Sequence, residues 1–148
     1  MAAPDQAAGN ARHVHGSAAS WAGRGVLLLG PPGSGKSSVL ACLLAAGAHL
    51  VADDVVRLER RGGILYAEGV SAAGLIELRG NGIFRVTTKG GAVVNLCVEL
   101  KADPGRERLP ERRETTILGV AVPVLHLDGD DPAAVARIMI ALAARRVD

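Results

Sequence analysis

Residues 30–37 read Gly-Pro-Pro-Gly-Ser-Gly-Lys-Ser (GPPGSGKS), and this stretch decides the fold. It fits the pattern GxxxxGK[ST] of a phosphate-binding P-loop. The apolar run Gly25–Leu29 before it predicts a buried strand, and Lys36–Ala46 after it predicts a helix that ends at Gly47. Because a P-loop requires this order of strand, loop and helix, the three segments together predict a site for nucleotide phosphates.

Each residue type in the loop has a chemical role there. Glycines allow successive backbone N–H groups to turn toward phosphate oxygens, and the helix N-terminus adds partial positive charge. Lys36 would reach the β and γ phosphates, and the Ser37 hydroxyl would ligate Mg²⁺. The motif alone does not distinguish a kinase from a nucleotide hydrolase or a small-molecule carrier. The expected nucleotide-binding residues are Gly30, Pro31, Pro32, Gly33, Ser34, Gly35, Lys36, Ser37 and Ser38.

The rest of the chain is rich in strand patterns. A doubly wound sheet would alternate strand and helix throughout, whereas here one helix follows the P-loop and many strands come in succession. We therefore expect an α/β domain with a mixed, partly antiparallel sheet. The strand candidates are Arg12–Gly16, Ala18–Ala22, His49–Ala52, Val55–Glu59, Ile64–Ala67, Leu75–Leu78, Ile83–Val86, Ala92–Leu100 and Thr115–Leu127, with Val55–Glu59 and Ile64–Ala67 forming a hairpin.

Two further segments complete the organisation of the chain. Lys101–Arg113 is dense in charge, contains two prolines and has no apolar face, which predicts a mobile loop. Asp130 and Asp131 precede Pro132, and this order predicts an N-cap followed by proline at the first position of a closing helix. The apolar stripe of that helix is Val135, Ile138, Met139 and Leu142.

Composition limits the function classes. The formal net charge is +2 and charged residues make up 22%, which is too near neutral to indicate a nucleic-acid or membrane surface. The sequence contains no uninterrupted run of about 18 apolar residues, the length that would predict a membrane-spanning helix. Residues 1–11 lack the apolar core of a secretory signal and are expected to be a flexible tail before a domain at 12–148. A cytoplasmic protein is the expectation, and a mean hydropathy of +0.25 favours a homo-oligomer.

The two cysteines, Cys42 and Cys97, lie far apart and show no metal-binding spacing. We expect two reduced thiols that pack as small apolar residues. His13 and His15 alternate on a possible strand and would share a face, but a third metal ligand is missing from the sequence nearby.

Acidic residues near the P-loop could select the reaction. Asp53 and Asp54 end the strand that follows the P-loop helix; one could support the metal region and the other could accept a proton from an attacking hydroxyl. A solvated strand end is the plainer interpretation. Glu77 lies in an apolar strand, where either an ion pair with Arg79 or a metal would explain it. Arg108, taken alone, fits a solvated loop residue.

Taken in order, five segments resemble the HPr kinase/phosphorylase family. They are His15-Gly16, the P-loop, Ala52-Asp53-Asp54, the stretch Ile76–Ile83 (IELRGNGI) and Arg108-Leu109, and the similarity covers Arg12 to Leu127. The chain resembles the short form seen in α-proteobacteria, without the extra N-terminal domain. Pro31-Pro32 stands where the family often has Asp-Ser, and the segment after Leu127 does not align with the one that the family uses in dephosphorylation.

The resemblance implies the fold that HPr kinase shares with PEP carboxykinase, and transfer of phosphate from ATP or pyrophosphate to a serine of the carrier protein HPr. Reverse phosphorolysis and a hexamer belong to the same expectation. It implies that Lys36 holds the donor phosphates, that Ser37 and Glu77 bind Mg²⁺ and that Asp54 is the base. Asp53, His15 and Arg108 would complete the catalytic set. The alternatives are a P-loop kinase for small molecules or nucleotides and a non-catalytic ATP-binding sensor.

Overall fold

The computed structural model describes residues 9–71, 74–105 and 107–148. Within these ranges, nine strands form one sheet and two more form a separate hairpin. The strands are β1 (Ala11–His15), β2 (Ser17–Trp21), β3 (Arg24–Leu29), β4 (His49–Ala52), β5 (Val55–Arg61), β6 (Ile64–Gly69), β7 (Leu75–Leu78), β8 (Gly82–Arg85), β9 (Gly91–Leu100), β10 (Arg113–Ile117) and β11 (Val120–Leu127). The strand before the P-loop, β3, lies between β9 and β2.

The large sheet is mixed, as the sequence predicts. Its path runs β1-β5-β6-β9-β3-β2-β4, and β11 joins it along β9 with β10 beyond. The pairs β3–β9 and β9–β11 are parallel, and the other pairs are antiparallel. Because β3, β9 and β11 run in the same direction, their carboxyl ends meet at one edge of the sheet. We call this the carboxyl edge.

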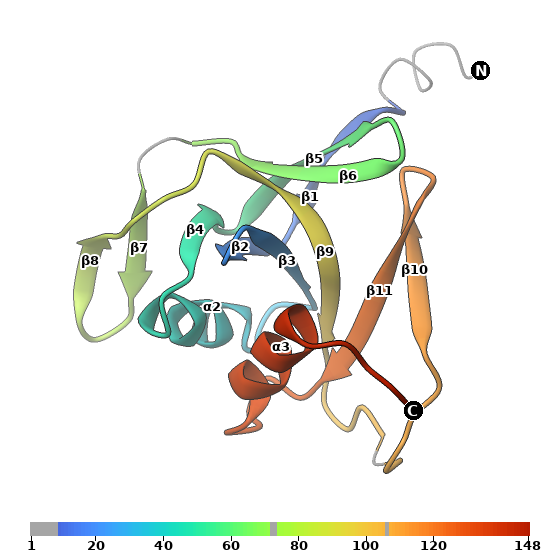
Figure 1. Ribbon diagram of the computed structural model, residues 1–148. Coiled ribbons are helices and arrows are strands. Elements are labelled where there is room, and N and C mark those ends of the chain that lie inside the picture. Colours follow the sequence, from blue (N-terminus) through green and yellow to red (C-terminus); the bar gives the residue numbers. More distant parts are fainter. Residues whose placement is uncertain (1–8, 72–73, 106) are drawn as a thin grey trace.

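Two helices cover one face of the sheet. α2 (Lys36–Ala45) follows the P-loop, and α3 (Ala134–Ala143) follows β11; Figure 1 shows the two helices on the same side of β2, β3 and β9. Leu40 and Leu43 of α2 and Ile138 of α3 are 0% exposed and lie in the same core cluster. Burial of each such side chain contributes about 1.5–3 kcal/mol, so these contacts hold both helices against the strands.

A second core lies on the other face, between β5, β6, β9 and the β10–β11 hairpin. Val56, Leu58 and Leu65 are at most 1% exposed there, and Cys97 and Ile117 belong to the same cluster. The predicted hairpin is confirmed and is longer than expected, since β5 continues to Arg61 and β6 to Gly69. Its aliphatic face therefore closes the second core.

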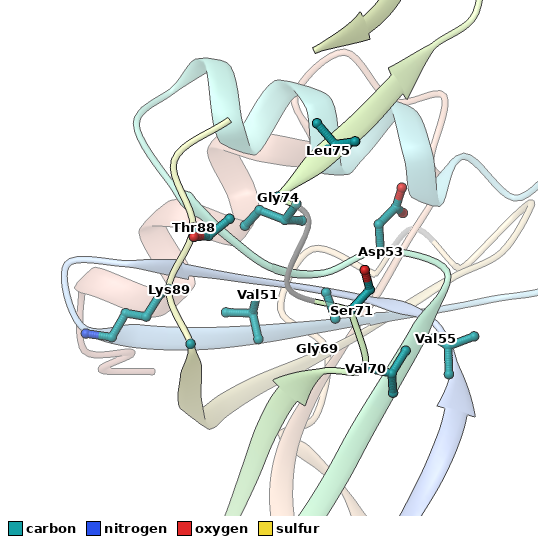
Figure 2. Close-up of a pocket in the computed structure, with 13 residues that line it drawn as sticks. Val51, Asp53, Val55, Gly69, Val70, Ser71, Gly74, Leu75, Thr88 and Lys89 are labelled. Atoms are coloured by element: carbon teal, nitrogen blue, oxygen red, sulfur yellow. The ribbon is translucent and has the colours of Figure 1, made fainter. Parts of the chain in front are cut away.

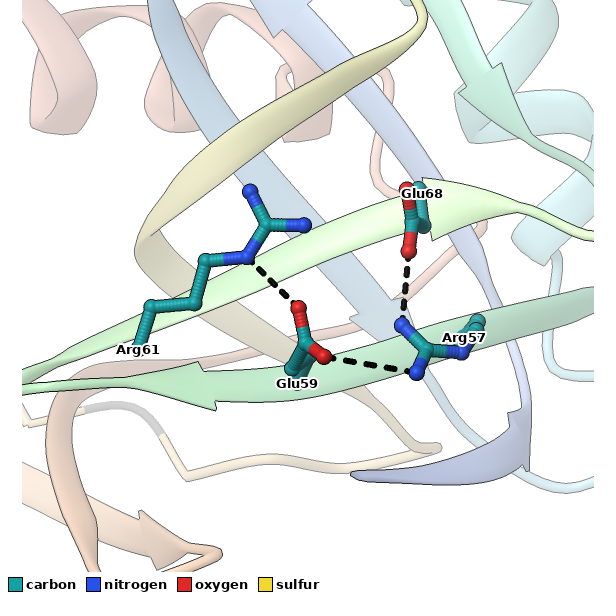
Figure 3. A network of polar contacts seen from close by, with 4 residues as sticks. All are labelled: Arg57, Glu59, Arg61 and Glu68. Atoms are coloured by element: carbon teal, nitrogen blue, oxygen red, sulfur yellow. Dashed lines mark hydrogen bonds and ion pairs between the residues drawn. The ribbon is translucent and has the colours of Figure 1, made fainter. Parts of the chain in front are cut away.

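Charged residues line the solvent face of that hairpin (Figure 3). Arg57 donates to Glu68 at 2.6 Å and to Glu59 at 3.4 Å, and Arg61 donates to Glu59 at 2.6 Å. Arg57 and Glu68 are direct cross-strand partners, so the ion pair agrees with the strand register. The guanidinium of Arg61 also lies 3.8 Å from the centre of the Tyr66 ring.

Two predicted boundaries are wrong in the last third of the chain. The span Thr115–Leu127 is two strands, β10 and β11, joined by a turn at Leu118 and Gly119. Arg113, placed in the charged loop, is the first residue of β10, while the described residues between Lys101 and Arg112 form no helix or strand.

The predicted start of the closing helix is also wrong. α3 begins at Ala134 after Ala133, and neither Asp130 nor Asp131 is its N-cap. Asp131 instead accepts a hydrogen bond from the Ala133 N–H at 2.8 Å within the turn that precedes the helix. The predicted apolar stripe is confirmed, because Ile138 and Leu142 are buried and Val135 and Met139 pack against the same core.

The cysteine prediction is half right. Cys97 is 0% exposed, but Cys42 is exposed on α2 because its position on the helix lies away from the sheet. Residues 1–8 of the predicted tail lie outside the described residues, and Ala11 is already the first residue of β1. Across the described ranges, no helix has both the length and the apolar character needed to span a membrane.

Candidate active site

The P-loop leaves the carboxyl edge between β3 and α2. Lys36 is the first residue of α2, and its ammonium donates to the carbonyl of Gly30 at 2.5 Å and to that of Pro31 at 3.1 Å. The positive charge therefore lies over the backbone of the loop. Ser37 and Ser38 are exposed at the start of the helix. Anions bind well in such a place, because unpaired N–H groups, the helix dipole and a cation all face it.

The base of the loop is tightly packed against the neighbouring strand. A Cβ at Gly30 would lie 2.7 Å from the carbonyl oxygen of Leu100, the last residue of β9, and 2.5 Å from the Ser34 hydroxyl. Both distances are too short for real contacts, so only glycine fits at this point. The Ser34 hydroxyl is buried and has no hydrogen-bond partner among the described residues.

Asp53 is held by a residue that the sequence argument did not single out. Ser17, the first residue of β2, is 2% exposed, and its hydroxyl donates to Oδ1 of Asp53 at 3.1 Å. Asp53 itself is exposed, just beyond the end of β4. The hydrogen bond orients one carboxylate oxygen, which leaves the other available to a ligand.

Asp54 has an unusual backbone. Its φ is +71°, a left-handed conformation that non-glycine residues seldom adopt. The turn is fixed from both sides, because the Val55 N–H donates to the Asp53 carbonyl at 2.8 Å and the Gly16 N–H donates to the Asp54 carbonyl at 3.0 Å. Such conformations concentrate at functional sites, where the surrounding structure imposes them.

Gly16 connects this turn to the strand that carries the P-loop. A Cβ at Gly16 would lie 2.7 Å from the carbonyl oxygen of Leu28, near the end of β3, so no side chain fits between them. His15, the residue before Gly16, pairs across the strands with Val55, and Val55 directly follows the acidic pair. The structure therefore brings His15, Asp53 and Asp54 next to the end of the strand that leads into the P-loop.

Glu77 and Arg108 show fewer contacts. Glu77 is exposed on β7, and no ion pair joins it to Arg79 in the described part of the chain, so the ion-pair interpretation of this residue is wrong for this structure. Arg108 is exposed in the segment that follows β9. No hydrogen bond or ion pair between described residues links Arg108 to the P-loop or to the acidic pair.

A cavity of about 360 Å³ adjoins Asp53 (Figure 2). Asp53 and Leu75, the first residue of β7, both line it, so the hairpin that carries Glu77 begins at the same cavity as Asp53. Figure 2 shows the Asp53 carboxylate at one end of the cavity and Lys89 at the other. The cavity is open enough to admit a small group next to the carboxylate.

Metal binding depends on few protein ligands here. No group of three His, Cys, Asp or Glu side chains that could hold a metal ion occurs in the ranges that the structure describes. The Ser37 hydroxyl and the Glu77 carboxylate, for which no ion pair with a described residue is seen, offer oxygen atoms of the type that Mg²⁺ prefers. Mg²⁺ commonly uses one or two protein ligands together with substrate phosphates and water, so these residues fit that ion.

Sequence reasoning missed Ser17 and Gly129 in this region. Ser17 lies between the predicted strands Arg12–Gly16 and Ala18–Ala22, and its partner Asp53 lies 36 residues away. Gly129 lies in the turn after β11, and a Cβ there would be 2.1 Å from the Ser34 carbonyl oxygen. Nothing in the local sequence indicates that contact.

Known proteins resemble this chain over most of its length. The HPr kinase/phosphorylase of Chlorobium phaeobacteroides strain BS1 is 40% identical over 129 residues, and that of Chloroherpeton thalassium is 37% identical over 129 residues. Each match covers 78% of this chain and 38% of the relative. The chain thus spans well under half the length of these relatives.

A solved structure shares the fold. The HPr(Ser) kinase/phosphatase from Coxiella burnetii superposes with a TM-score of 0.73, at 24% sequence identity, over 88% of this chain and 87% of that one. The α/β architecture with its mixed sheet is therefore that of a known kinase structure.

The family model described as HPr Serine kinase C-terminal domain matches residues 6–147. The match extends beyond the span from Arg12 to Leu127 on which the resemblance was recognised, and it includes the turn with Gly129 and all of α3. Its range includes the P-loop and the acidic pair. The chain belongs to the HPr serine kinase C-terminal domain family.

Proposed function

We propose that this chain transfers the γ-phosphoryl group of ATP to a serine hydroxyl of an HPr-type phosphocarrier protein. The observation that carries the proposal is the acidic turn beside the strand that leads into the P-loop, with Gly16 packed between them. The names of the relatives support the choice of acceptor. The family match does not favour a small-molecule kinase or an ATP-binding sensor.

The donor phosphates would lie over the P-loop. Backbone N–H groups of the loop would bind the phosphate oxygens, and Lys36 would exchange its contacts with the Gly30 and Pro31 carbonyls for the β and γ phosphates. Pyrophosphate would fit the same place, because the loop contacts phosphates and not the nucleoside. Ser37 and Glu77 would hold Mg²⁺, which neutralises charge that develops on the transferred group.

Asp54 would accept the proton of the seryl hydroxyl as it attacks the phosphorus, and would return it in the reverse reaction with inorganic phosphate. Asp53, fixed by Ser17, would keep the neighbouring carboxylate in place. His15 and Arg108 would contact the reacting phosphates, with Arg108 on the loop that follows β9. The proposal includes assembly into a homo-oligomer, a hexamer by family resemblance, and a cytoplasmic location, where ATP is available.

Transfer of labelled phosphate from Mg·ATP to an HPr-type carrier protein tests the proposal. We expect serine phosphorylation by the wild-type chain, a rate about 10²–10⁴-fold lower for Asp54→Asn, and loss of ATP affinity in calorimetry for Lys36→Ala. Transfer by the wild type that is no faster than by Asp54→Asn would defeat the kinase assignment.

The metal assignment has its own measurement. Glu77→Gln should move the Mg²⁺ dependence of the transfer rate to higher concentration, because one anionic ligand is lost. Glu114→Gln, at an exposed position on β10, is the matched control and should leave the curve in place. Superimposable curves for Glu77→Gln and wild type would show that Glu77 is not a metal ligand.

A further inference from the structure

The turn between β11 and α3 presses directly on the P-loop. Gly129 lies against the peptide that joins Ser34 to Gly35; a Cβ at Gly129 would be 2.1 Å from the Ser34 carbonyl oxygen and 3.1 Å from the Cα of Gly35. The contact is mutual, since a Cβ at Gly35 would lie 3.1 Å from the Cα of Gly129. The two backbones touch with no side chain between them.

We propose that Gly129 is a positioning residue for the phosphate-binding loop, a role that rests on the proposed function of that loop. The turn formed by residues 128–131, here called the supporting turn, holds the Ser34–Gly35 peptide in the orientation that directs the following N–H groups toward the phosphates. The supporting turn itself contacts no ligand in this proposal; it acts through the loop.

The need for glycine at this position comes from the contact alone. Gly129 does not have the left-handed backbone that restricts other glycines of this chain, including Gly33 and Gly35 of the loop. An alanine would therefore adopt the same backbone without strain, but its methyl group would require about 1 Å more room, because carbon and oxygen approach to about 3.3 Å at closest.

The supporting turn is rigid enough to transmit this constraint. Asp128 accepts the N–H of Asp130 on its carboxylate at 2.9 Å and the N–H of Asp131 on its carbonyl at 3.1 Å. Asp131 accepts the N–H of Ala133 at 2.8 Å and pairs with Arg137 of α3 at 3.0 Å. The turn is thus fixed at both ends, and a methyl group at position 129 would press on the loop.

The other side of the loop is closed as well. Gly30 contacts the Leu100 carbonyl at the end of β9, and the Leu127 carbonyl at the end of β11 accepts the Lys101 N–H at 2.9 Å. The loop is therefore held between the ends of two parallel strands. A methyl group at position 129 would displace Gly35, which accepts the first hydrogen bond of α2 from Val39 at 2.9 Å, and with it Lys36.

Gly129→Ala tests the proposal, with Gly63→Ala as the matched control. Gly63 lies in the β5–β6 turn, also without a left-handed backbone, and a Cβ there meets nothing within 4 Å. We expect affinity for ATP and for pyrophosphate, measured by calorimetry, to fall by about ten- to hundredfold in Gly129→Ala, as for a catalytic group displaced by about 1 Å. Gly63→Ala should bind as the wild type does.

Amide NMR spectra without ligand separate this proposal from the proposed function. In Gly129→Ala the amides of Gly33, Ser34, Gly35 and Lys36 should shift, and in Gly63→Ala they should not. Unchanged loop amides would overturn the positioning role even if the wild type is an active kinase. If the loop amides shift in Gly129→Ala but the wild type binds neither ATP nor pyrophosphate, the contact is supported and the proposed function is rejected.

If Gly129→Ala does not fold, hydrogen exchange of the wild type decides. Pyrophosphate should protect the amides of Asp130 and Asp131 in the supporting turn together with those of the P-loop, because the two segments move as one unit. Protection confined to the P-loop would overturn the proposal.

Discussion

The Ser17 hydroxyl donates a hydrogen bond to Oδ1 of Asp53 at 3.1 Å, from a position that is only 2% exposed. The bond joins the start of β2 to the end of β4. A buried hydroxyl that orients an exposed carboxylate is placed to support a reacting group.

Ser17→Ala should therefore lower the rate of phosphoryl transfer by several-fold and leave ATP affinity unchanged. The reason is that Asp53 loses one fixed orientation while the P-loop keeps its contacts. Steady-state kinetics with varied ATP and carrier protein would show a fall in kcat without a rise in KM for ATP. Ser17→Thr retains the hydroxyl and should recover most of the rate, which a purely structural role for a small residue would not predict.

Substitutions of Asp54 should affect stability and activity differently, because its backbone is left-handed and its carboxylate is the proposed base. Asn tolerates this conformation, whereas Ala destabilises it by about 1 kcal/mol or more. Denaturant unfolding should rank Asp54→Ala below both Asp54→Asn and Asp54→Gly, while all three lose phosphoryl transfer because the carboxylate is gone. Equal stability of the Ala and Asn variants would show that the turn relaxes in solution.

The two cysteines should react very differently. Burial, with a smaller contribution from Glu99, raises the pKa of the Cys97 thiol to about 12, whereas Cys42 is exposed on α2. At pH 8 a thiol-alkylating reagent should modify Cys42 in the folded protein and reach Cys97 only after unfolding. Mass spectrometry of wild type and Cys42→Ser checks this; rapid modification of folded Cys42→Ser would contradict it.

The raised pKa of Cys97 also has a consequence for stability at high pH. Its folded value lies above the ordinary 9.0, so folding favours the neutral thiol. That contribution is complete below pH 9.0 and is lost as the pH rises toward about 12. Cys97→Ala should remove this part of the alkaline destabilisation.

The Glu59 carboxylate has the opposite dependence. The hydrogen bond from Arg61, and then that from Arg57, hold the pKa of Glu59 below its usual value. The pair therefore stabilises the fold above the unfolded pKa of glutamate, near 4.5, and this stabilisation is lost as the pH falls through the lower folded value. Because the pair is exposed, salt should weaken it.

Arg61→Ala is the variant that checks this dependence. Its free energy of unfolding should be lower than that of the wild type at pH 7. The difference should shrink as the pH falls below the pKa of a glutamate carboxyl group in the unfolded chain. In a Glu59→Gln background the same substitution should have little effect, since the charge partner is absent. A difference that persists unchanged at low pH would show that Arg61 acts through its contact with the Tyr66 ring instead.

Local patterns predicted the elements well where local chemistry decides them. His49–Ala52 and Leu75–Leu78 have the predicted bounds, and the P-loop helix begins at Lys36 as expected. The β10–β11 hairpin was missed because its turn is Leu118-Gly119, with φ of +50° and +80°. A hairpin turn with both central residues left-handed usually has the sequence Asn-Gly. Leu-Gly lacks that signal, so the sequence does not predict a turn here.

The candidate site shows the same limit. The P-loop and the acidic pair are each a continuous stretch of sequence, so their residues alone predict them. Ser17 and Gly129 act through contacts with residues 36 and 95 positions away, as the numbering of Asp53 and Ser34 shows. Such contacts depend on how the strands are ordered in the sheet, and no local periodicity encodes that order.

Gly16 touches the strand that ends in the P-loop on one side and donates to the turn of Asp54 on the other. The spacing between the Asp54 backbone and the strand that leads into the P-loop is thus set when the sheet folds. Rotation of the Asp54 side chain would still vary the distance from its carboxylate to the phosphate, but the starting point of that side chain would need no closing movement to set it. Even one added methyl group at Gly16 would push the Asp54 turn away from the strand that leads into the P-loop.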